Sequence, residues 1–243
     1  MTEKGICKFC EQPKELINSH IIPKKFYLDY EKDNGYRSID LDGNWEKCYN
    51  GQKDYLLCHE CDAGLFKKLD DYGYKIFLNE YANHIEQQDK DFVLYHLNKN
   101  DFDYYLLRKF FISVLWRASI SKIKGFLNVD LGVYENIAKD ILNDKTIHPE
   151  LFNFFIFKFP DGKDLNKTVY IKRLKFYNST LYNIVMAGFD ILIIVKNNMP
   201  YAIKEIYNHY IATENDLYIF ESEGVYKDHE QKLLKIANRW KKS

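Results

Sequence analysis

The chain has 243 residues, of which 46% are hydrophobic and 29% are charged, and its 35 basic residues balance its 35 acidic residues. These values are ordinary for a soluble globular protein of one large or two small domains. A net charge of zero argues against a sequence-independent DNA coat protein, which depends on a basic field. No apolar run approaches the roughly 18 residues of a membrane helix, and the first residues lack a signal-peptide pattern. We therefore expect a cytoplasmic protein that does not contact a membrane.

Two Cys-x-x-Cys pairs stand in the first quarter of the chain: Cys7 with Cys10, and Cys58 with Cys61. Each such turn directs two sulfurs toward one point, and two turns supply the four thiolates of a closed tetrahedral zinc site. The pattern predicts one structural Zn²⁺ ion, and the alternative is two unrelated pairs of buried thiols. The fifth cysteine, Cys48, is expected to be a buried or incidental thiol.

A single histidine lies in an apolar, strand-like run between the two pairs. His20 precedes Ile21 and Ile22, and Pro23 follows. A strand there would hold the imidazole rigidly and would end at the proline. Residues 26–55 carry Asp-Asn-Gly and Asp-Gly turn signals, which predict two or three short strands or loops.

A helix is predicted over residues 62–78, because Leu65, Leu69 and Ile76 fall at helical spacing. Asp62 would lie in its first turn, where the helix dipole favours a carboxylate. Two roles for Asp62 stay open at this point, a metal ligand and an N-cap, and one side chain could serve as both.

The order of these features resembles the zinc-stapled HNH endonucleases of the ββα-metal (His-Me finger) group, over about residues 5–70. The resemblance implies an N-terminal ββα, treble-clef-like module in which the four paired cysteines bind structural zinc. It also implies that His20 is the general base that activates water, and that Asp62 binds a catalytic Mg²⁺ or Mn²⁺ ion. Three further side chains are candidates for assisting them: Asp54, His59 and Glu60.

Some positions depart from the family pattern. Ser19 stands where the family has an acidic or imidazole metal ligand, no Gly-Gly follows Pro23, and the middle asparagine has no clear counterpart near Lys53. Serine is a poor ligand for a hard cation. A second interpretation is therefore a catalytically inactive zinc-built module that binds nucleic acid or protein, and a third is a structural zinc knob on an interaction domain.

The middle of the chain is predicted to be helical. Residues 77–100 are polar and are expected to contain a loop at Glu86–Asp91. The helix Asp101–Lys122 is apolar around most of its circumference, so it should be central to the core. Arg117 lies within that helix, and a buried carboxylate is a more frequent partner for it than a phosphate. A further helix is expected at Val133–Asn143.

Residues after Pro149 are rich in Phe, Ile, Val and Tyr between turn signals, which predicts an antiparallel sheet joined by hairpins. Ile203–His209 could be a helix or a strand, and His229–Lys242 should be a closing amphipathic helix. The expected strand segments are Phe152–Phe159, Thr168–Tyr177, Tyr182–Val195 and Leu217–Glu221.

Together these patterns predict an α+β fold with two domains, a zinc-binding HNH-like module at residues 1–70 and a helical plus antiparallel β domain of unknown role at residues 71–243. The expected function is metal-dependent hydrolysis of nucleic-acid phosphodiesters, of DNA more than RNA. A stand-alone protein of this kind suggests phage defence or a mobile element by analogy. Exposed sheet edges would suit a homodimer or a partner protein.

Overall fold

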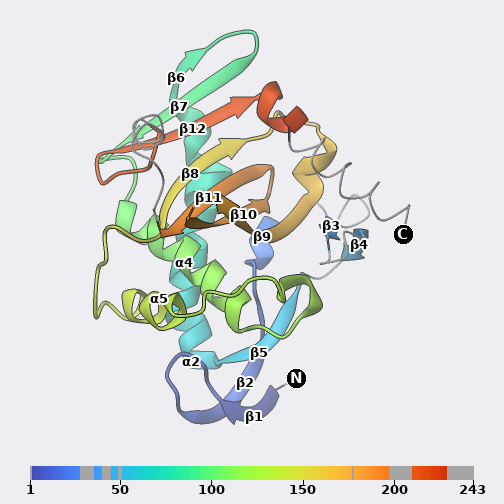
Figure 1. Ribbon diagram of the computed structural model, residues 1–243, viewed down its shortest axis with the longest axis vertical. Coiled ribbons are helices and arrows are strands. Elements are labelled where there is room, and N and C mark those ends of the chain that lie inside the picture. Colours follow the sequence, from blue (N-terminus) through green and yellow to red (C-terminus); the bar gives the residue numbers. More distant parts are fainter. Residues whose placement is uncertain are drawn as a thin grey trace.

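The fold combines helices with two β-sheets, which confirms the predicted α+β class. A three-stranded sheet has the strand order β1-β2-β5, and a nine-stranded sheet has the order β4-β3-β9-β10-β11-β8-β12-β7-β6. Helix α4 runs between the two sheets (Figure 1). The computed structural model describes residues 2–27, 36–39, 45–48, 51–176, 178–196 and 210–228.

The small sheet is antiparallel and leads directly into a helix. His20 lies opposite Lys53, and Leu16 lies opposite Cys58 at the other end of the same strand pair. In the chain, β3 and β4 lie between β2 and β5, and the identity of this unit with the predicted ββα module stays a prediction. The three strands are β1 (Thr2–Ile6), β2 (Pro13–His20) and β5 (Lys53–Cys58).

A helical run follows β5 without a break and continues to Glu80. It starts at His59 with Cys58 as its N-cap residue, so the N-cap interpretation of Asp62 is wrong. The predicted helix starts too late because its apolar stripe begins only at Leu65. The run consists of α2 (His59–Cys61), a π-helical stretch (Asp62–Phe66), α3 (Lys67–Tyr74) and a second π-helical stretch (Lys75–Glu80).

Helix α4 (Tyr104–Ile120) confirms the predicted central helix, and α5 (Tyr134–Leu142) confirms the helix after it. The N-cap of α4 is Asp103, whose carboxylate accepts a hydrogen bond from the backbone N–H of Leu106 at 3.0 Å. An Asp cap of this kind satisfies a backbone donor that has no partner within the helix.

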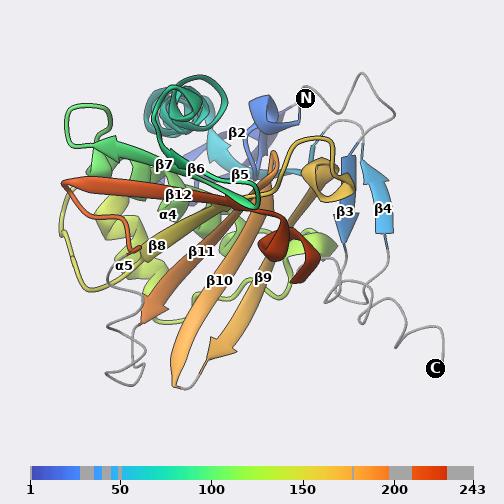
Figure 2. The ribbon, with the colours of Figure 1, turned by 90° about the horizontal axis from the view of Figure 1, so that it is seen from above.

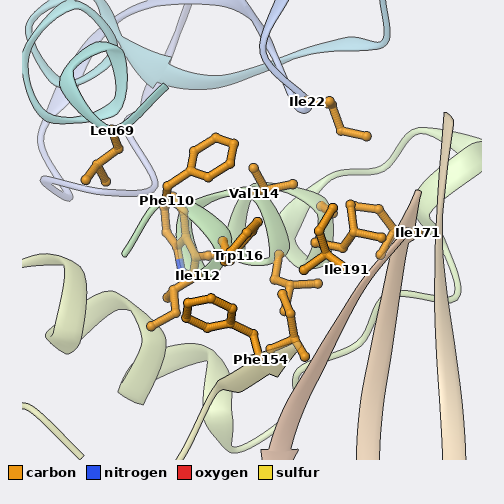
Figure 3. Packing of buried hydrophobic residues seen from close by; sticks show 14 of the residues in the cluster. Ile22, Leu69, Phe110, Ile112, Val114, Trp116, Phe154, Ile171 and Ile191 are labelled. Atoms are coloured by element: carbon orange, nitrogen blue, oxygen red, sulfur yellow. The ribbon is translucent and has the colours of Figure 1, made fainter. Parts of the chain in front are cut away.

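The side chains of α4 fill the space between the two sheets. Phe110 stacks on Phe26, with 5.6 Å between ring centroids, and Phe111 meets the edge of Phe154 at 4.8 Å. One continuous hydrophobic core therefore extends from the small sheet through α4 to the large sheet. Figure 3 labels nine of its residues: Ile22, Leu69, Phe110, Ile112, Val114, Trp116, Phe154, Ile171 and Ile191.

The large sheet is mixed rather than purely antiparallel, which corrects the prediction. Strand β12 pairs in parallel with β8, and β3 pairs in parallel with β9, while the other neighbours are antiparallel. In Figure 2 the pair β3 and β4 lies beside β9 at one end of the sheet. The strands are β3 (Tyr36–Ile39), β4 (Trp45–Cys48), β6 (Ile85–Gln88), β7 (Phe92–Asn98), β8 (Asn153–Lys158), β9 (Thr168–Phe176), β10 (Ser179–Met186), β11 (Phe189–Lys196) and β12 (Asp216–Ser222).

Two predicted segments differ from the observed strands for local reasons. The expected single strand Tyr182–Val195 is a hairpin, because Ala187 and Gly188 take positive φ angles of 50° and 78° and form a two-residue turn. The polar segment around Glu86–Asp91, expected to be a loop, contributes the exposed edge strand β6. A strand at a sheet edge needs no apolar side chains when both of its faces are solvated.

The division of the chain at residue 70 stays a prediction. Position 70 lies inside α3, and the same core includes residues on both sides of it. The predictions for Ile203–His209 and His229–Lys242 fall outside the described residues. Across the stretches that the structure describes, no helix combines the length and the apolar character needed to cross a membrane.

Candidate metal centre and the predicted catalytic histidine

The four predicted cysteines come together at the end of the small sheet. Their Sγ atoms all lie within 4.8 Å of one another, and the sulfurs of Cys10 and Cys58 are 4.0 Å apart. None of the four forms a disulfide. Four thiols at this spacing could hold a metal ion, and a set of four sulfurs suits zinc. The group consists of Cys7, Cys10, Cys58 and Cys61.

Backbone geometry brings the two Cys-x-x-Cys turns together. Cys58 is the last residue of β5 and Cys61 lies one helical turn beyond it, so both sulfurs face the same point. The first turn is tied to β5 because Lys8 donates its N–H to the carbonyl of Leu56 at 2.9 Å. The N–H of Cys58 also points at the sulfur of Cys7, at 3.4 Å.

The thiols differ in how readily they lose their protons. Burial raises the pKa of Cys7, but backbone N–H groups of Cys10, Cys58 and Phe9 outweigh it and lower that pKa to about 7. Burial raises the pKa of Cys58 and of Cys61 above the ordinary thiol value. Cys7 therefore forms a thiolate more easily than Cys58 or Cys61, and the charge of a bound cation would favour deprotonation of those two.

An aromatic cluster backs the first cysteine turn. The ring of Phe9 packs edge-on against Phe66 at 5.0 Å and against Trp116 at 5.7 Å. Phe66 belongs to the helical run that begins at the second turn, and Trp116 belongs to α4. This cluster joins both metal-binding turns to the core of the larger part of the chain.

His20 is the last residue of β2, as predicted, and its side chain is half-buried. Its imidazole lies directly against the backbone of Gly51, where a β-carbon would come within 2.6 Å of the ring Cδ2 atom. Gly51 has a φ of 70°, which glycine adopts without cost. A side chain at position 51 would occupy the space in which the ring of His20 lies, so a glycine is needed there.

The buried arginine of α4 pairs with a carboxylate, which confirms the preferred interpretation of Arg117. Its Nη2 lies 2.7 Å from Asp70 Oδ1, and its Nη1 lies 3.1 Å from Asp70 Oδ2. The same Nη1 donates to the backbone carbonyl of His20 at 3.1 Å. Burial raises the pKa of Asp70, while the adjacent guanidinium opposes that rise.

Two of the other predicted participants, Asp54 and Glu60, have partners of their own. The carboxylate of Asp54 accepts hydrogen bonds from the hydroxyl of Ser121 at 2.8 Å and from the N–H of Lys122 at 3.0 Å, so it binds the residues that follow the end of α4. Glu60 pairs with Lys14 at 3.1 Å. Both carboxylates therefore have partners within the protein.

Asp62 and Ser19 occupy the two positions implied for a catalytic ion. Asp62 is half-buried in the first turns of the helical run, and Ser19 is 5% exposed, with its hydroxyl directed at the carbonyl of Ile17 at 3.5 Å. Among the described residues, the four cysteines are the only group of three or more His, Cys, Asp or Glu side chains placed to hold a metal ion. The catalytic roles of His20 and Asp62 stay predictions.

Asp70 and Gly51 were not singled out from the sequence, although each carries a signal. Asp70 follows Leu69 and stands four residues after Phe66, on the buried side of a helix. A carboxylate at that spacing is the kind of partner that a buried arginine requires. Gly51 follows an asparagine, and an Asn-Gly pair indicates a turn. The pair does not indicate that the glycine leaves room for the imidazole of His20.

No protein-family model matches this chain, and no curated protein or solved structure matches it either. The resemblance to HNH endonucleases therefore depends on the cysteines, the histidine and their order along the strands and helix.

Proposed function

We propose that the chain is a metal-dependent endonuclease of HNH type, in which a structural zinc ion bound by the four cysteines stabilises the module that presents His20. The observation that carries the proposal is the place of this histidine. It ends the first strand of a strand–strand–helix unit whose helix begins at the metal-binding cysteines. A rigid strand end is suited to hold a general base in one orientation.

The proposed chemistry assigns one step to each of two side chains. A neutral imidazole at His20 accepts a proton from a water molecule, which is the general-base role that histidine most often has in enzymes. The carboxylate of Asp62 binds Mg²⁺ or Mn²⁺, which usually retain several water ligands and need few protein ligands. A bound divalent ion of this kind stabilises the charge on the scissile phosphate.

Substitution of the histidine tests the proposal directly. We expect His20→Ala to abolish divalent-ion-dependent nicking of plasmid DNA while zinc content and thermal unfolding stay unchanged. Asp62→Ala should raise the Mg²⁺ concentration needed for half-maximal nicking before it abolishes cleavage. His84→Ala is the matched control, because His84 lies outside the module and pairs with Asp101.

Equal cleavage by the wild-type chain and His20→Ala would contradict the proposal. The same series should include structured RNA, since a phosphodiester is common to both nucleic acids. A strong preference of the wild-type chain for RNA would change the substrate but not the role of the histidine.

A second function is a zinc-built module that binds nucleic acid without cleaving it, and the side chain of Ser19 favours it. The hydroxyl is buried and directed at a backbone carbonyl, so it does not replace the missing acidic ligand as a cation-binding group. Binding of plasmid DNA by a wild-type chain that cleaves neither DNA nor RNA would support this second function.

A further inference from the structure

The peptide bond after His20 has both of its polar groups held by other parts of the chain. The carbonyl of His20 accepts a hydrogen bond from Arg117 Nη1 at 3.1 Å, and the N–H of Ile21 donates to the carbonyl of Gln52 at 3.0 Å. A peptide unit is planar, so fixing both ends sets its rotation. The direction in which the His20 side chain leaves the backbone is thereby restricted.

The guanidinium that holds this carbonyl is itself fixed on several sides. It binds both oxygens of Asp70, and its Nε donates to the carbonyl of Ser113 at 3.2 Å. The side chain of Arg117 is 1% exposed, so its guanidinium is almost completely shielded from solvent. A planar guanidinium held by a carboxylate fork has little rotational freedom left.

Asp70 belongs to α3, within the helical run that starts at His59, directly after Cys58, and contains Cys61 and Asp62. Arg117 thus touches both halves of the proposed active module, the strand end that carries the base and the helix that carries the ion ligand. It does so from α4, which lies outside residues 1–70.

We propose that the Arg117–Asp70 pair is a positioning device that sets the orientation of His20 relative to the helix carrying Asp62. This inference depends on the proposed nuclease function for its catalytic meaning. Neither residue is assigned a contact with substrate, because the guanidinium reaches only the backbone of His20. Gly51 contributes because its missing side chain leaves room for the imidazole.

A purely structural ion pair is the competing explanation, and α4 contains a matched control for it. Arg108 is buried in the same helix and donates to the backbone carbonyls of Ile147 and Leu151 at 2.9 and 2.8 Å. Among the described residues, its hydrogen bonds go to the segment 147–151 and not to the small sheet. Substitution of Arg108 should therefore disturb the fold to a similar extent without moving His20.

The test compares Arg117→Lys with Arg108→Lys in the full chain loaded with zinc. The first readout is the pair of imidazole ¹H–¹³C resonances of His20, assigned by their loss in His20→Ala. We expect them to shift or broaden in Arg117→Lys and to stay in place in Arg108→Lys. The second readout is nicking of plasmid DNA, for which kcat should fall by up to about 10²-fold with little change in KM, as for a misplaced catalytic group.

Asp70→Asn is the second variant if Arg117→Lys does not fold. It keeps one oxygen acceptor for Arg117 and removes the charge, so the His20 resonances should shift in the same direction by a smaller amount. Unchanged His20 resonances in a folded Arg117→Lys variant, or an equal shift in Arg108→Lys, would overturn the inference. A wild-type chain that does not cleave would contradict the proposed function, whereas the resonances would still decide the role of Arg117.

Discussion

The small and the large sheet are stabilised by different means. In the small sheet, β1 has no buried side chain, β2 buries only Leu16 and Ser19, and β5 buries Leu56, Leu57 and Cys58 at its end. In the large sheet, nearly every residue of β10 and β11 is buried. We therefore expect the small sheet to depend on its candidate metal site as well as on apolar burial, while the central strands of the large sheet depend mainly on apolar burial.

The largest effect should follow from removing one thiolate of the metal centre. Cys58→Ser is expected to abolish zinc binding and to unfold the small sheet, since zinc sites of this type contribute on the order of 10 kcal/mol. Metal analysis and amide hydrogen exchange would show the loss of zinc and of protection in β2 and β5. Cys48→Ser is the control with the same chemistry, and it should retain both. Full zinc content in Cys58→Ser would contradict the assignment of this site.

A core substitution in the large sheet should lower the stability of the protein without changing its zinc content. Phe154 is fully buried and packs on Phe111 and Tyr104. We expect Phe154→Ala to lower the free energy of unfolding by about 3–5 kcal/mol. Zinc content should not change. Phe157, a half-buried neighbour on the other face of β8, provides the control, and Phe157→Ala should cost clearly less in a denaturant titration.

A buried lysine at the far end of β8 should give a smaller effect that depends on pH. Lys158 Nζ lies 2.9 Å from Glu221 and 2.9 Å from Asp161. Burial lowers the pKa of Lys158, but the two carboxylates outweigh it and raise the pKa above its ordinary value. The folded state therefore binds the proton of Lys158 more tightly than the unfolded state does.

The resulting stabilisation is fully present below the pKa of lysine in the unfolded chain, which is about 10.4. It is lost as the pH rises through the higher pKa that Lys158 has in the folded protein. Lys158→Met should cost about 2 kcal/mol at pH 7 because it leaves Glu221 without its charged partner. Chemical denaturation at pH 7 and above pH ~11 should show the difference shrinking at the higher pH. A cost that does not depend on pH would show that packing of the side chain, rather than its charge, is responsible.

The smallest effect is expected where the first cysteine turn meets α5. Glu11 lies 2.5 Å from Lys139, which lowers the pKa of this exposed carboxyl. Exposed ion pairs contribute little to stability and are screened by salt. Glu11→Gln should therefore change thermal stability only slightly at low salt and not at all near 1 M salt. A large loss of zinc in this variant would show that the contact matters to the metal site.

Local features of the fold could be predicted from the sequence, and non-local ones could not. The central helix was expected at residues 101–122 and lies at 104–120, because helical spacing is read within a short window. The need of Arg117 for a carboxylate was also visible, but its partner Asp70 lies 47 positions away in sequence. The four cysteines were identifiable because metal binding restricts their spacing.

Strand order depends on pairings that no local pattern records. Nothing in the segment Asp216–Ser222 indicates that it lies parallel to β8 and antiparallel to β7. The edge strand Ile85–Gln88 was missed because its exposed residues lack the alternation that identifies a half-buried strand. The position of His20 at a strand end was predicted, whereas the contacts of its carbonyl and its ring depend on tertiary structure.

The place of β12 in the large sheet has a consequence for biosynthesis. It lies between β7 and β8, although it follows β8 by more than 50 residues in the chain. On the ribosome, β3, β4, β6 and β7 emerge before β8 to β11, so in a nascent chain that ends before residue 216 the edges of β7 and β8 that pair with β12 are both open. Such edges pair readily with other chains. Completion of the sheet must therefore wait until residues 216–222 have been translated, while the cysteine turns and α4 are available much earlier.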